Sequence, residues 1–188
     1  MHVLGLDIST SIVGVCIVDD STGVLVPTLL DHIDLGKCNG FWEKVDTVTA
    51  YIDNLKSRQD FSNISNIAVE EALIGFTKGM SSAQTITTLI AFNAVIRHVL
   101  RLAYQIEPQC IPAATARKKA GVAVISKAKC GISVKDQVFA HMCKNDLSYK
   151  VWPLKKATKK NPNPSVKDFA KDITDAYVIA KASYLLNK

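Results

Sequence analysis

The 188-residue sequence lacks several patterns that would assign it to a class at once. Its five cysteines form no C-x-x-C pair and its four histidines are widely spread, so neither a disulfide framework nor a zinc ribbon is indicated. No uninterrupted apolar run reaches the roughly 18 residues that span a bilayer. The first apolar run has no basic region ahead of it and meets Asp7 at once, unlike a signal peptide. We therefore expect an intracellular protein in a reducing compartment, with no membrane partner.

Positive charge is concentrated in two segments of a chain whose net charge is +6. Residues 117–135 hold six lysine or arginine residues and no acid, and residues 150–171 hold seven lysines against one aspartate. The rest of the chain is consequently net acidic. This asymmetry favours a polyanionic partner on one face, although solvated surface lysines would produce the same pattern.

The hydrophobic pattern predicts an α/β domain that occupies residues 1–188. Three strands joined by short turns come first, as an antiparallel meander, and are followed by helix, strand, helix, strand and further helices. That order predicts a mixed five-stranded sheet with helices on both faces. We expect strands at 3–6, 12–18, within 24–35, 64–69 and 109–111, and helices at 41–55, 81–104, 115–121, 133–144 and 166–186. Thr115 and Ser133 are the expected N-caps, and the Lys/Pro-rich stretch 148–165 is an expected exposed loop.

Carboxylates follow two of the expected strands and lie on the last helix. Asp7 ends the first strand and Glu70-Glu71 end the fourth, where sheets of this kind place their sites. Side chains alternate across a strand, so one glutamate of the pair should face solvent. Asp172 and Asp175 are three apart and project from one helical face. Each acid alone fits a turn, an exposed pair or a helix start, but together they predict a cage of oxygen ligands for divalent cations.

Three acidic motifs in this order resemble those of the RuvC-type Holliday junction resolvases. A basic segment before the last helix also resembles the corresponding segment of that family. The motifs are Val3-Leu4-Gly5-Leu6-Asp7 with a Ser/Thr turn and Gly14, then Ala68-Val69-Glu70-Glu71, then Asp172-Ile173-Thr174-Asp175-Ala176, and the basic stretch is 111–119 with Lys135.

The resemblance implies an RNase H-like fold and a homodimer that binds a four-way DNA junction. Each subunit would cut one strand with Mg²⁺, for which Mn²⁺ would substitute. The implied catalytic residues and metal ligands are Asp7, Glu70, Asp172 and Asp175. The implied DNA contacts are Arg117, Lys118, Lys119 and Lys135, together with Leu73 and nearby Phe76, where bacterial members carry an aromatic residue that stacks in the junction centre.

The turn after Asp7 lacks the family's glycine, so its geometry is expected to differ from the family's. Residues 148–165 look like an insertion, which favours a viral, phage or organellar branch that would act in the host cytoplasm if viral. One alternative is a related nuclease of the same fold that acts on flaps, forks or RNA–DNA hybrids. Others are a non-catalytic DNA-binding module and an actin-like ATP-binding lobe, for which the chain is short and lacks a second phosphate motif.

Overall fold

The computed structural model describes residues 1–21, 23–72, 82–157 and 165–188. One five-stranded sheet runs through it in the order β3-β2-β1-β4-β5. The first three strands pair antiparallel, whereas β4 pairs parallel with β1 and β5 pairs parallel with β4, which confirms the predicted mixed sheet. The strands are β1 (His2–Ile8), β2 (Ile12–Asp19), β3 (Val26–Asp34), β4 (Ile64–Glu70) and β5 (Gln109–Ile111).

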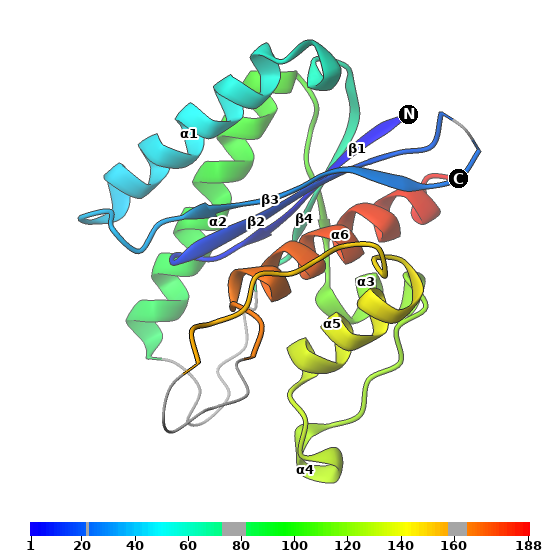
Figure 1. The fold of residues 1–188 in the computed structure, drawn as a ribbon. Coiled ribbons are helices and arrows are strands. Elements are labelled where there is room, and N and C mark those ends of the chain that lie inside the picture. The colour runs from blue at the N-terminus through cyan, green and yellow to red at the C-terminus, as the bar shows by residue number, and fades with distance from the viewer. Residues whose placement is uncertain (22, 73–81, 158–164) are drawn as a thin grey trace.

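Helices cover both faces of the sheet, as the element order predicted. Figure 1 shows α1 and α2 on one face and α3, α5 and α6 on the other, with α4 projecting away from the body. The helices are α1 (Phe41–Ser57), α2 (Ala83–Tyr104), α3 (Ala113–Lys119), α4 (Lys127–Cys130), α5 (Val134–Asn145) and α6 (Phe169–Leu186), with the 3₁₀ turn η1 (Gln59–Phe61).

Two predicted helix starts are wrong and one is confirmed. Helix α3 begins directly after Pro112, so Thr115 lies inside its first turn and is not the N-cap. Helix α6 begins at Phe169 because Val166 instead forms an antiparallel bridge with Leu154. Ser133 caps α5 as expected, since its hydroxyl accepts a hydrogen bond from the backbone N–H of Asp136.

Alternation along the strands separates two hydrophobic cores. In β1, Leu4, Leu6 and Ile8 belong to the core beneath α1 and α2, whereas Val3 belongs to the core beneath α6. Asp7 lies four positions after Val3, so alternation places it on the same side of the sheet as Val3. The strand therefore directs its aspartate toward the α6 face.

Glycines let α6 lie directly on the sheet. A Cβ placed on Gly14 would come within 2.1 Å of the Asp172 carbonyl oxygen, and one on Gly5 within 2.5 Å of the Ala176 carbonyl oxygen. Gly14 is also the partner of Asp7 in the register between β1 and β2. The absence of a side chain at Gly14 thus brings the backbone of Asp172 next to the strand pair that carries Asp7.

Helix α2 is long and apolar enough to cross a membrane by length and composition alone. Its most apolar 18-residue window has a mean hydropathy of 1.4, and 22% of that window is buried. Phe92, Ile96 and Leu100 pack into the core, which accounts for part of this apolar character. Ile90 and Leu102 remain exposed, so the helix also presents apolar surface to the outside.

Candidate active site

Asp7 is a buried acid near the carboxyl end of a central strand, and 8% of its surface is exposed. The turn that follows has no glycine and is organised by Ser9 instead. The Ser9 hydroxyl accepts a hydrogen bond from the Ile12 N–H at 3.1 Å and donates one to the Ile12 carbonyl at 2.6 Å. Ser9 therefore closes the β1–β2 turn and holds the strand end that carries Asp7.

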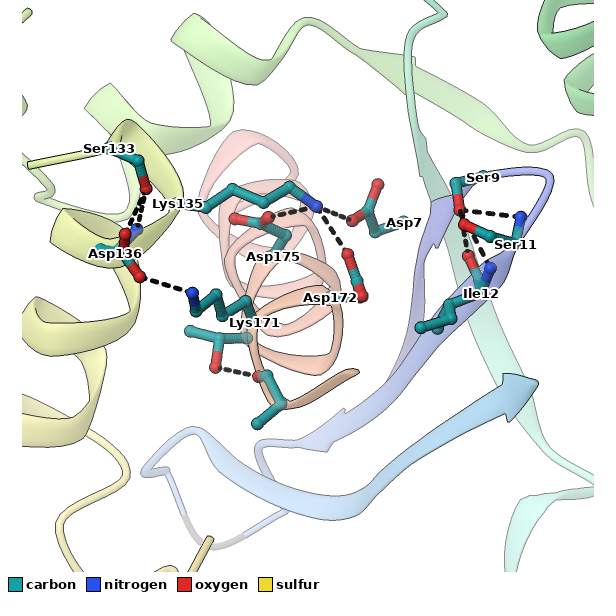
Figure 2. A network of polar contacts seen from close by, with 12 residues as sticks. Asp7, Ser9, Ser11, Ile12, Ser133, Lys135, Asp136, Lys171, Asp172 and Asp175 are labelled. Carbon is teal, nitrogen blue, oxygen red and sulfur yellow. Dashed lines mark hydrogen bonds and ion pairs between the residues drawn. The ribbon is translucent and has the colours of Figure 1, made fainter. Parts of the chain in front are cut away.

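Three carboxylates from two elements converge on one ammonium group. Figure 2 shows Asp7 of β1 and Asp172 and Asp175 of α6 pointing at the side chain of Lys135, which enters from the first turn of α5. The Lys135 Nζ lies 2.6 Å from Asp172 Oδ1, 3.3 Å from Asp7 Oδ2 and 3.3 Å from Asp175 Oδ2. Acids more than 160 positions apart in sequence thus share one cation position.

Glu70 joins this cluster, whereas Glu71 does not. Glu70 lines a cavity of about 60 Å³ together with Lys135, Asp175 and Arg117. Its backbone carbonyl accepts a hydrogen bond at 3.1 Å from the side-chain amide of the buried Asn93, which fixes the end of β4. Glu71 lines a separate cavity against α2. The structure therefore places Glu70, and not Glu71, beside the other acids.

Crowding of buried acids raises their pKa values. Burial, with the Asp7 and Asp175 carboxylates, raises the pKa of Glu70 to about 8. Burial and the Asp7 carboxylate likewise raise the pKa of Asp175 to about 7. The pKa of Asp7 is raised by burial, although the Lys135 ammonium opposes this. For Lys135, burial works to lower the pKa, but the surrounding carboxylates outweigh it and raise the pKa. Negative charge at this site consequently needs a cation beside it.

The donor set of the cluster is of the kind that binds divalent cations, but the Lys135 ammonium lies among the carboxylates. Within the described ranges, no group of three or more His, Cys, Asp or Glu side chains is arranged to hold a metal ion. The three aspartate carboxylates instead surround the ammonium of Lys135 at 2.6–3.3 Å. Magnesium binds oxygen at roughly 2.0–2.1 Å. The donors are hard carboxylate oxygens already directed at a common positive charge, so their chemistry suits Mg²⁺ or Mn²⁺.

The expected DNA contacts divide into three groups. Lys118 and Lys119 are exposed on α3, while Arg117 lies partly buried beside Glu70. Lys135 is partly exposed, and its ammonium contacts the three aspartates of the cluster. Leu73 and Phe76 lie outside the described residues.

Sequence reasoning did not single out two lysines that the fold places next to the site. Lys127 and Lys171 line a groove of about 550 Å³ together with Lys135 and Asp172. Lys171 also forms an ion pair with Asp136 at 2.6 Å. Both lysines belong to the basic segments noted in the sequence, but charge counting alone could not say which of those lysines border the acids.

Comparison with known proteins identifies the fold. No family model matches the sequence, and no curated protein matches it. Among solved structures, Thermus thermophilus RuvC in complex with a Holliday junction substrate matches with a TM-score of 0.62 and 14% identity over 100% of this chain and 94% of that chain. Another T. thermophilus RuvC structure matches with a TM-score of 0.62 and 19% identity, over 100% and 95%. The yeast mitochondrial Holliday junction resolvase Ydc2 matches with a TM-score of 0.57 and 15% identity, over 98% and 80%. The chain therefore has the RNase H-like fold of the RuvC-type Holliday junction resolvases, as its acidic motifs predicted.

Proposed function

We propose that this protein is a metal-dependent, structure-selective endodeoxyribonuclease that cuts four-way DNA junctions by phosphodiester hydrolysis. The observation that carries the proposal is the convergence of Asp7, Asp172 and Asp175 on one cation position, next to Glu70. Burying this many acids together is unfavourable unless a cation compensates them. A structural role alone does not account for such a cluster at the carboxyl ends of two parallel strands.

In this proposal, one group of residues binds the cation and another binds DNA. Asp7, Glu70, Asp172 and Asp175 would be the ligands of Mg²⁺ or Mn²⁺. When bound, the divalent cation would stabilise the attacking and leaving oxygens of the hydrolysed phosphodiester. The exposed Lys118 and Lys119 would neutralise backbone phosphates beside the scissile bond.

The choice of a four-way junction as substrate rests on the similar structures. One of the matched RuvC structures contains a Holliday junction, and Ydc2 is described as a Holliday junction resolvase. Both fold matches extend over nearly the whole of this chain. We infer that this protein also acts on branched DNA, in recombination or repair.

A cleavage assay with a panel of substrates tests the proposal. The purified protein is incubated with synthetic four-way junctions, flaps, forks, linear duplexes and RNA–DNA hybrids, each with Mg²⁺, Mn²⁺ or EDTA. We expect paired cuts in the junction that depend on the metal. Preferential cutting of another substrate would assign the same chemistry to a different nuclease class, and stable ATP binding without any cleavage would contradict the proposal.

Asp7→Asn tests the role of the central acid. The change keeps the shape of the side chain but removes its charge, so we expect junction cleavage to fall by roughly 10³-fold. DNA binding should stay intact or tighten, because less negative charge then faces the phosphates. Asp146→Asn is the matched control, since Asp146 pairs with Lys181 and lies outside the acid cluster. An Asp7→Asn protein that cuts at the wild-type rate would remove Asp7 from the mechanism.

We also propose that the protein acts as a homodimer through α2. Of this 22-residue helix only Phe92, Asn93, Ile96 and Leu100 are buried, which leaves apolar surface such as Ile90 and Leu102 uncovered. Two copies with one site each would place one cut in each of two strands. Sedimentation velocity should give a dimer at assay concentrations, and Leu102→Glu should shift it toward monomer. A wild-type monomer under those conditions would refute the dimer.

A further inference from the structure

The ammonium of Lys135 occupies the centre of the acid cluster. It has three N–H donors, and three carboxylates from β1 and α6 surround it within 3.3 Å. We propose that Lys135 is a positioning residue whose ammonium holds the carboxylates together until a divalent cation displaces it. This inference rests on the proposed function, because it concerns entry of the metal into the same site.

Ammonium and metal ion cannot occupy the cluster together. A magnesium ion bound to the same oxygens would lie about 2.0–2.1 Å from each of them. Those oxygens already surround Lys135 Nζ, at 2.6 Å for Asp172 and 3.3 Å for both Asp7 and Asp175, so the ion would compete with the ammonium for them. Binding of the ion thus requires the lysine to leave and the carboxylates to close inward.

The arrangement of the side chains makes that departure feasible. The Lys135 side chain is 52% exposed, whereas those of Asp7, Asp172 and Asp175 are 11–15% exposed. The ammonium therefore reaches the recessed acids from the solvent side. Its four-carbon stem is flexible, so it can swing out while the N-cap at Ser133 keeps the start of α5 in place.

The neighbouring groove gives the displaced ammonium a second place to bind. Lys135 lines that groove of about 550 Å³ with Lys127 and Lys171, and with the acids Asp168 and Asp172. A DNA phosphate in the groove would attract the released ammonium as the metal takes its place among the acids. Lys135 would thus couple filling of the metal site to occupation of the groove by DNA.

Titration of Mn²⁺ into the protein without DNA tests the displacement. Isothermal titration calorimetry should show that Lys135→Met binds Mn²⁺ on the order of tenfold more tightly than wild type, because no ammonium competes. Lys135→Arg retains the positive charge and should not gain affinity. Lys181→Met is the matched control, since it removes an ammonium that pairs with Asp146 outside the cluster, and it should bind Mn²⁺ like wild type.

Thermal unfolding gives a second readout. In EDTA, Lys135→Met should melt below wild type because its carboxylates repel one another, and Mn²⁺ should raise its melting temperature more than that of wild type. A Lys135→Met protein that folds only in excess Mn²⁺ would also support the proposal. Unchanged or weaker Mn²⁺ binding in folded Lys135→Met, or failure to fold with and without Mn²⁺, would overturn it.

These results are separable from the test of the proposed function. Wild-type protein that cuts junctions, combined with unchanged Mn²⁺ affinity in Lys135→Met, would refute the role of Lys135 and leave the nuclease assignment standing. Tighter Mn²⁺ binding in the variant, combined with no cleavage of any nucleic acid by wild type, would support displacement and refute the nuclease.

Discussion

The two faces of the sheet are built from different side chains. Beneath α1 and α2, strands β1 and β2 contribute large aliphatic residues such as Leu4, Leu6 and Ile17. Beneath α6, the same strands contribute Gly5 and Gly14, over which the helix backbone passes at contact distance. Several buried positions of α6 are also small, namely Ala170, Thr174, Ala176, Ala180, Ala182 and Ser183, while larger residues such as Tyr177 and Ile179 complete the core around them.

The difference shows that one face of the sheet mainly supplies stability, whereas the other mainly fixes the positions of the acids. Aliphatic side chains can shift rotamers and tolerate modest changes in shape, so the α1/α2 face supplies apolar burial with some latitude. A helix backbone in direct contact with a strand has no side chain that could adjust. The α6 face therefore fixes Asp172 and Asp175 relative to Asp7, which is what a shared cation position requires.

Adding a methyl group at Gly14, where α6 contacts β2, should produce the largest effect. In Gly14→Ala the new methyl would overlap the Asp172 carbonyl, so α6 must move away from β2. We expect a loss of about 3 kcal/mol in the free energy of unfolding, together with loss of junction cleavage and of Mn²⁺ binding. Urea unfolding and the assays described above measure these quantities. Wild-type stability and cleavage in Gly14→Ala would show that the close approach is not needed.

A change of pH should have the second-largest effect, through the acid cluster on the α6 side of the sheet. The pKa of Glu70 is about 8 in the folded protein, above the ordinary value of 4.5. Between these values the folded state binds more protons than the unfolded state, so the stability of the metal-free protein falls as pH rises and then levels off above about 8. We expect the melting temperature in EDTA to drop on the order of 5 °C from pH 5 to pH 8.

Glu70→Gln provides the control for this titration. Glutamine is neutral throughout, so the variant should lose part of the pH dependence. A wild-type melting temperature that rises between pH 5 and pH 8, or an identical slope in Glu70→Gln, would contradict the raised pKa.

A trimmed side chain on the α1/α2 face should have the smallest effect. Ile17 lies on β2, three residues from Gly14 but on the opposite side of the sheet, and it is fully buried. Ile17→Val should cost about 1 kcal/mol of stability. Junction cleavage should not change, because repacking among aliphatic groups leaves α6 in place. Loss of cleavage from this variant would erase the distinction between the two faces.

Much of the fold could be predicted because the pattern of hydrophobicity is strong. Strand order along the chain, the mixed sheet and the main helices followed from runs of apolar residues and their turns. The start of α6 was placed too early because Val166 continues the apolar pattern while its backbone pairs with Leu154. Such a pairing between distant residues leaves no local signal.

The candidate site could be predicted in part. Motif order predicted the four acids as a site, and the folded sheet places Glu70 rather than Glu71 beside the others. The position of Lys135 among the acids could not be foreseen, because it depends on how α5 docks against α6. The same holds for Lys127 and Lys171, whose shared groove is formed only by the tertiary structure.

Anomalous diffraction from crystals soaked in Mn²⁺ tests the central claim most directly. That claim is that Asp7, Glu70, Asp172 and Asp175 form one site for divalent cations. The account predicts an anomalous peak within coordination distance of Asp7 and Asp172 oxygens, with the Lys135 ammonium moved out of the cluster. No peak at saturating Mn²⁺, with Lys135 still bonded to all three aspartates, would contradict it.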